Sequence, residues 1–79
     1  MLNSMPDTLA SLQPGTEAAI TSIHAGEALH HRLAAMGFRV GQRVCLMRRG
    51  ALNGPLHVRI GSTDIVMRRS DARCVKVAL

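Results

Sequence analysis

Alternating apolar and polar residues dominate the second half of the 79-residue chain, with the period of β-strands. In the stretch LHVRI, the apolar residues Leu56, Val58 and Ile60 fall on one face and the polar residues between them on the other. The same alternation appears in RVCLMRR, TDIVMRR and CVKVAL. The inward positions expected in these three stretches are Val44, Leu46, Ile65, Met67, Val75, Val77 and Leu79. The pattern therefore predicts four short strands in succession.

Turn-forming residues separate these strands. In ALNGP, Asn53 and Gly54 are able to adopt positive φ, and Pro55 starts the next strand. In SDAR, Ser70 is a candidate cap for a short helical turn. Connections this short favour antiparallel neighbours.

The stretch GEALHHRLAAM has a helical period instead. Leu29, Leu33 and Met36 stand at positions i, i+4 and i+7, so they form one apolar stripe. Gly37 lies where a left-handed glycine usually ends a helix, and Phe38 could then fold back against the helix end. We therefore predict a helix that stops abruptly at this glycine.

The stretch before the helix predicts a short turn and a strand. In DTLASLQPG, Asp7 or Thr8 can cap a turn whose Leu9 and Leu12 point inward. The following TEAAITSI, residues 16–23, is rich in residues that favour strands.

The order of these elements predicts a mainly β fold. We expect a small β-barrel of about five strands, with one α-helix between the first and second strands. Closure of the barrel would remove exposed sheet edges. Residues 1–8 are expected to form a flexible tail and residues 9–79 the single domain.

Composition and charge narrow the choice of partners. Phe38 is the one aromatic residue, so the core must be aliphatic. The net charge is +5, and nine of the ten basic residues are arginines. This charge fits a solubilising surface, an acidic protein, nucleic acid or an anionic membrane face. Two cysteines and no long apolar run predict a cytoplasmic protein with reduced thiols.

Catalytic motifs are not evident, so we do not expect an enzyme. His24, Glu27 and His31 are candidate metal ligands, and Glu27 and His31 form an i, i+4 pair. A solvent-exposed pair with no metal role explains the same spacing. No cofactor is required, and any divalent ion here, zinc or iron, would bind weakly. Nucleic acid binding is not expected, because small barrels usually stack bases on aromatic residues.

The chain resembles the FeoA family from about Leu9 to Val77. The resemblance depends on the order and spacing of RLAAMGFRVGQRV, RRGALNGPLHVRIGSTDIVMRRSDA and CVKV. The matching residues are Arg32, Leu33, Met36, Gly37, Phe38, Gly41, Val44, Gly54, Pro55, Leu56 and Arg68. One departure is Val40, where the family commonly has proline before the glycine.

The resemblance implies an SH3-like barrel that serves bacterial ferrous iron uptake. It implies a cytosolic accessory protein at the inner membrane face, bound to FeoB, a permease with a G-protein domain. From the residues themselves, and not from the resemblance, we expect the helix end and its arginines to dock on an acidic region of this partner. The candidate partner-binding residues are Arg32, Met36, Phe38, Arg39, Val40 and Arg43. The alternatives are a metal-binding regulatory module and a small RNA-binding barrel, and a homodimer is compatible with each.

Overall fold

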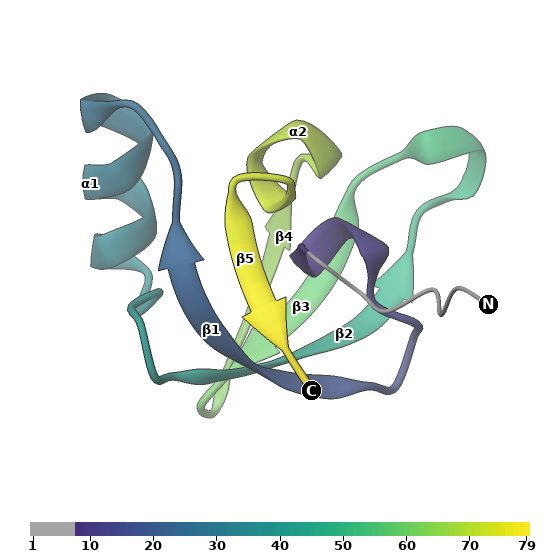
Figure 1. The fold of residues 1–79 in the computed structure, drawn as a ribbon. Coiled ribbons are helices and arrows are strands. Elements are labelled where there is room, and N and C mark those ends of the chain that lie inside the picture. Colours follow the sequence, from purple (N-terminus) through teal and green to yellow (C-terminus); the bar gives the residue numbers. More distant parts are fainter. Residues whose placement is uncertain (1–7) are drawn as a thin grey trace, which may run out of the picture.

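Five antiparallel strands form one curved sheet in the computed structural model, which describes residues 8–79 (Figure 1). The strand order across the sheet is β4-β3-β2-β1-β5. The elements along the chain are η1 (Leu9–Ser11), β1 (Glu17–Ile23), α1 (Glu27–Ala35), β2 (Arg43–Arg49), η2 (Ala51–Asn53), β3 (Leu56–Ile60), β4 (Thr63–Met67), α2 (Arg69–Ala72) and β5 (Val75–Ala78). The mainly β class and the helix between the first two strands are confirmed.

The core consists of aliphatic side chains and one aromatic ring, that of Phe38, as the composition predicts. Leu9, Leu12 and Phe38 are buried together with the inward residues of the strands. Ile65 is only partly buried, and Leu79 is wrong as an inward position because it is 64% exposed. Strand β5 ends at Ala78, so no neighbouring strand holds Leu79 against the core.

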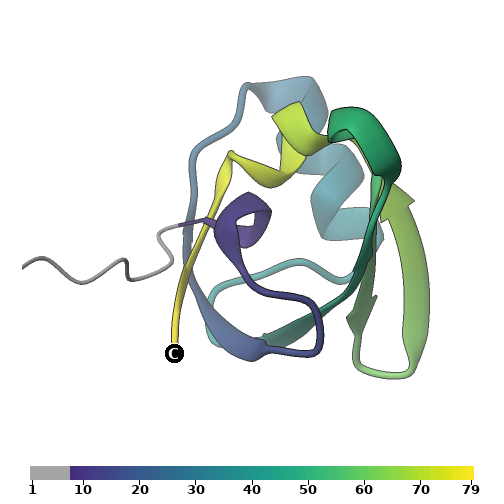
Figure 2. The same ribbon diagram turned by 90° about the vertical axis from the view of Figure 1, so that its right-hand side faces the viewer.

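The sheet curls without closing into a hydrogen-bonded barrel. Strands β4 and β5 stand at its two ends and do not pair with each other in the part of the chain described. The short helix α2 connects them, and η1 packs against α2 and β5 on the concave side (Figure 2). The predicted closure is therefore wrong in its hydrogen bonding, because the two end strands do not pair and the chain between them forms α2 instead. Strand β4 remains a sheet edge.

Of the two predicted helix caps, the one near the start of the chain is confirmed and the one near its end is wrong. Thr8, one of the two candidate caps, is the N-cap of η1 and forms an isolated antiparallel bridge with Lys76 of β5. Residues 1–7 of the predicted tail lie outside the described residues. Ser70 is not a cap, because α2 begins at Arg69 with Arg68 in the N-cap position.

Helix α1 ends in the glycine motif that the sequence predicts. Gly37 has a φ of 99°, a conformation that glycine adopts without strain. The Gly37 amide donates to the Ala34 carbonyl at 3.0 Å, and the Phe38 amide donates to the Leu33 carbonyl at 3.0 Å. Phe38 and Leu33 are both buried in the core, which is the apolar contact that completes this motif. The bend therefore turns Phe38 inward and sends the chain into β2.

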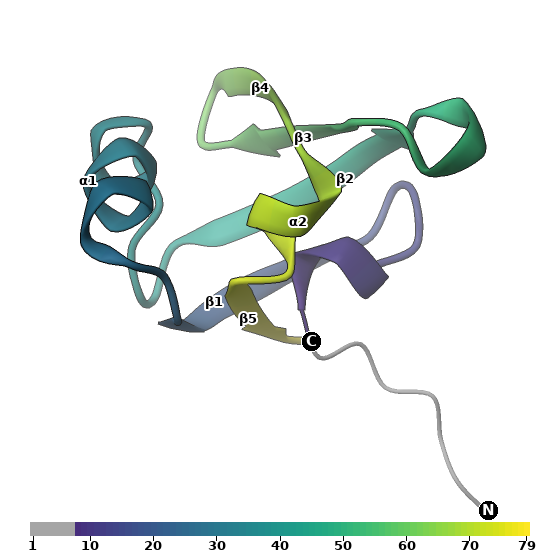
Figure 3. The ribbon, with the colours of Figure 1, turned by 90° about the horizontal axis from the view of Figure 1, so that it is seen from above.

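The connection between β2 and β3 lies at the opposite end of the molecule from α1 (Figure 3). Its positive φ values fall on Leu52 (55°) and Asn53 (62°), so the prediction for Gly54 is wrong. Position 54 requires glycine for a steric reason instead, because a Cβ there would lie 2.9 Å from the Ala51 carbonyl oxygen. We call residues 50–55 the Leu52 loop.

Replacing Gly50 with alanine should destabilise the domain by about 1–3 kcal/mol. A Cβ at this position would lie 2.7 Å from the Pro55 carbonyl oxygen, which accepts a hydrogen bond from the Gly50 amide. The backbone of the loop would have to open to accommodate it. Urea unfolding measures the loss, with the exposed neighbour Ala51→Ser as the control expected to change little. Equal stability of Gly50→Ala and the parent would show that the loop is not held this tightly.

Candidate partner-binding site

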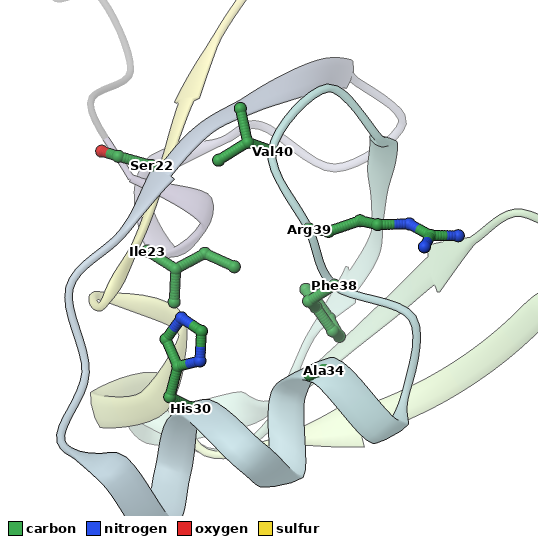
Figure 4. A pocket seen from close by; sticks show the side chains of 7 residues that line it. All are labelled: Ser22, Ile23, His30, Ala34, Phe38, Arg39 and Val40. Carbon is green, nitrogen blue, oxygen red and sulfur yellow. The ribbon is translucent and has the colours of Figure 1, made fainter.

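A pocket of about 410 Å³ lies between the end of β1, helix α1 and the segment after Gly37 (Figure 4). Three separate parts of the sequence form it, and the glycine turn brings the third part against the helix. Its lining residues are Ser22, Ile23, His30, Ala34, Phe38, Arg39 and Val40.

The pocket is apolar inside and polar at its rim. Figure 4 shows the side chains of Ile23 and Val40 directed into the space, with the His30 ring beside Ile23. The Arg39 side chain points away from the space, as does the Ser22 hydroxyl, which lies 3.0 Å from His24 Nε2. Such a surface can take apolar side chains, with a cation beside it.

The pocket brings together three of the six predicted partner-binding residues. Phe38 is 1% exposed and lines the pocket from the core, whereas Val40 is 65% exposed at its edge. Arg39, next to both, is exposed. Phe38 is thus almost wholly internal, and the roles of these three residues in partner binding stay predictions.

The other three predicted residues are engaged elsewhere. Arg32 lies 3.3 Å from the Asp71 carboxylate of α2, and Arg43 lies 3.1 Å from Glu17 of β1. Met36 is half-buried and packs against the core. Their roles in partner binding stay predictions, and the ion pairs give both arginines a structural task as well.

The predicted metal ligands do not converge. Glu27 and His31 form the expected pair on α1, with 3.9 Å between Oε2 and Nε2. His24 instead lies against Ser22. Across residues 8–79 there is no group of three histidine, cysteine, aspartate or glutamate side chains that could hold a metal ion. The pair alone offers two of the three or four ligands that a dedicated site needs.

The comparison with family models covers the whole of the described chain. The family model described as the FeoA domain matches residues 8–79, which is every residue that the structure describes. The chain belongs to the FeoA family. A search of curated proteins finds no match.

Solved structures of other FeoA proteins are similar to this FeoA-family chain. Iron(II) transport protein A from Clostridium thermocellum is 29% identical with a TM-score of 0.87, over 91% of this chain and 44% of that one. FeoA from Chlorobium tepidum is 29% identical with a TM-score of 0.85, over 91% and 69%. Stenotrophomonas maltophilia FeoA, a zinc complex described as a prokaryotic SH3 domain protein, is 35% identical with a TM-score of 0.78, over 89% and 87%. This chain thus spans less than half of the Clostridium protein.

No helix within residues 8–79 of this FeoA-family chain is both long and apolar enough to cross a membrane.

Among residues 8–79 of the FeoA-family chain, Asp64 on the outer face of the β3–β4 hairpin has a strongly lowered pKa. Arg59 Nε donates to Asp64 Oδ1 at 2.6 Å, and His57 Nε2 lies 3.2 Å from Oδ2. The hydrogen bond from Arg59 is the main cause that lowers the pKa of Asp64 to about 2; desolvation opposes it, and the hydrogen bond from His57 lowers the pKa further. Sequence reasoning missed this cluster, although the hairpin register that pairs Arg59 with Asp64 was readable from the alternation.

The folded state should lose the contribution of Asp64 as the pH falls from about 4 towards 2. The carboxylate is favoured in the folded state, so its contribution is fully present above the ordinary aspartate pKa of 3.8 and disappears near 2. Because the side chain is 42% exposed, solvent screening keeps the contribution small. Urea unfolding of the parent and Asp64→Asn from pH 2 to pH 6 measures it. The urea midpoints of the two proteins should differ above pH 4 and converge near pH 2. A difference between the midpoints that does not change with pH would contradict the lowered pKa of Asp64.

Six of the nine arginines have no carboxylate partner within the described chain. Arg49 is half-buried and donates to the Leu12 carbonyl at 2.5 Å. The others are Arg39, Arg48, Arg68, Arg69 and Arg73. Arg69 is half-buried, whereas Arg39, Arg48, Arg68 and Arg73 are exposed and available for contacts outside the molecule.

Proposed function

We propose that the chain is a non-enzymatic accessory protein of bacterial ferrous iron uptake, which binds the cytosolic part of a FeoB-type permease with a G-protein domain. The observation that carries the proposal is the FeoA-domain match over residues 8–79. The name of the 29% identical Clostridium protein, iron(II) transport protein A, supports the link to ferrous iron. Such a partner would place the protein at the inner face of the membrane.

The pocket beside Val40 is the contact surface that this proposal favours. Its volume of about 410 Å³ can admit apolar side chains of a partner segment. Arg39 beside it and the net charge of +5 favour a segment that also carries acidic residues. The apolar contacts would supply affinity, and the charges would steer the encounter.

Binding fits this pocket better than catalysis does. The Ser22 hydroxyl and His24 form a hydrogen-bonded pair, which is the start of a nucleophile and base arrangement. No carboxylate orients His24 among the residues described, and the Ser22 hydroxyl points away from the pocket. Nothing else that lines the pocket offers a nucleophile with a paired base.

Calorimetric titration of the chain into the isolated cytosolic part of the permease tests the proposal. Saturable binding at physiological salt is the expected result. An unrelated G-protein domain of equal net charge is the control for attraction by charge alone, and it should not bind. Absence of binding to the permease, combined with tight ferrous iron binding by the chain alone, would overturn the proposal in favour of a metal-binding module.

A further inference from the structure

Leu52 is the most exposed large apolar residue of the described chain. Its exposed fraction is 99%, so it contacts nothing in the fold. Its backbone is left-handed, with φ 55° and ψ 47°. Glycine or asparagine suits this conformation better than leucine does, because neither is strained there to the same extent. The fold therefore gives no reason for a leucine at this position.

The Leu52 loop holds this side chain on a firm support. The Gly50 amide donates to the Pro55 carbonyl at 2.8 Å, and the Gly54 amide donates to the Ala51 carbonyl at 3.0 Å. Arg49 fastens the base of the loop to the Leu12 carbonyl. Leu52 thus projects from a loop with two internal hydrogen bonds and little room for rearrangement.

Cations stand at the base of the loop. Arg48 is exposed and lies two residues before Gly50. Arg68 is also exposed and follows Met67, which pairs with Leu56 at the start of β3. Neither arginine has a carboxylate partner within residues 8–79. An apolar tip above two uncompensated cations is complementary to a surface with an apolar interior and anionic groups above it.

We propose that the Leu52 loop inserts into the headgroup region of a membrane that contains anionic lipid. Leu52 enters the boundary of the acyl chains, while Arg48 and Arg68 remain at the level of the lipid phosphates. A lipid surface fits better than a protein pocket, because Leu52 stands alone at a tip rather than within an apolar patch. The proposal does not depend on the permease, since a lipid vesicle alone supplies the ligand.

A single introduced tryptophan can locate the insertion. The chain has no tryptophan or tyrosine, so Leu52→Trp gives an emission signal from this position alone. Vesicles of phosphatidylcholine with about one third phosphatidylglycerol should shift this emission to the blue, as the anionic headgroups attract the arginines. Leu79→Trp is the control, because Leu79 is exposed at the end of the chain, on the side away from η2 (Figure 1). Its emission should not move.

Vesicle sedimentation with the tag-free full-length chain measures how much the leucine contributes. In Leu52→Asn, the asparagine tolerates the left-handed backbone but lacks the apolar side chain. This variant should lower the partition coefficient of the protein between vesicles and water about fivefold. Leu79→Asn should leave it unchanged. Arg48→Gln and Arg68→Gln should each lower it by a similar factor, and added salt should weaken binding of the parent.

Three outcomes would overturn the proposal. The parent could ignore the anionic vesicles, or Leu52→Asn could bind them as well as the parent does. The Leu52→Trp emission could also stay unshifted while the protein sediments with the vesicles, which would mean that another face binds. If vesicles fail but Leu52→Asn weakens binding to the permease's cytosolic part, the loop is a protein contact instead. Unfolding curves for each variant exclude loss of the fold as the cause.

Discussion

Replacing Phe38 with alanine is expected to destabilise the domain by about 3–5 kcal/mol, the usual cost of deleting a buried phenylalanine side chain. The ring is 1% exposed and completes the end of helix α1 against Leu33. A domain of this size has a total stability of roughly 5–10 kcal/mol, so much of it would be lost. Urea unfolding followed by circular dichroism measures the change.

Phe38→Leu is the matched variant for this prediction. It keeps an apolar side chain that can still meet Leu33, so the expected loss is only about 1–2 kcal/mol. If alanine and leucine at this position destabilise the domain equally, the aromatic ring does not fill the space that the structure assigns to it. If neither destabilises it, the helix end is not part of the core.

The second large effect concerns partner binding. Val40→Glu is expected to weaken binding to the cytosolic part of the permease at least about tenfold, because an unpaired carboxylate would have to enter or cover an apolar pocket. Stability should change by less than about 0.5 kcal/mol, since Val40 is 65% exposed. Calorimetric titration measures the affinity.

Val66→Glu controls for the added negative charge. Val66 is exposed to a similar extent, 70%, but it lies on β4 and does not line the pocket. This variant should keep most of the affinity. Equal losses in both variants would indicate that only net charge matters, and normal binding by Val40→Glu would remove the pocket from the contact surface.

Local chemistry made much of the fold predictable. The alternation in LHVRI placed Leu56, Val58 and Ile60 in the core, where all three are buried. Gly37 ended the helix as predicted, because a left-handed residue and its two hydrogen bonds depend on neighbours within a few positions. The sequence motifs alone resemble those of the FeoA family, and the family match confirms the resemblance.

Features that depend on distant parts of the chain were not predictable in this way. The pocket needs Ile23, Ala34 and Val40 to meet, although three different elements carry them. The partner of Arg32 is Asp71, which is 39 positions away. Strands β4 and β5 do not pair, and η1 packs against α2 and β5; alternation within strands carries no information about either fact. The positive φ of Leu52 was not predictable either, because glycine or asparagine usually adopts this conformation.

The position of Phe38 couples the folding equilibrium to the binding equilibrium of the pocket. The same ring belongs to the core and to the pocket lining, so a molecule that fills the pocket touches a side chain on which folding depends. Any occupant that binds only the native protein must then raise the melting temperature in proportion to the logarithm of its concentration above saturation. As the sole aromatic side chain, Phe38 also supplies the only ring-proton resonances apart from histidine. Its NMR signals would therefore report pocket occupancy from within the hydrophobic interior.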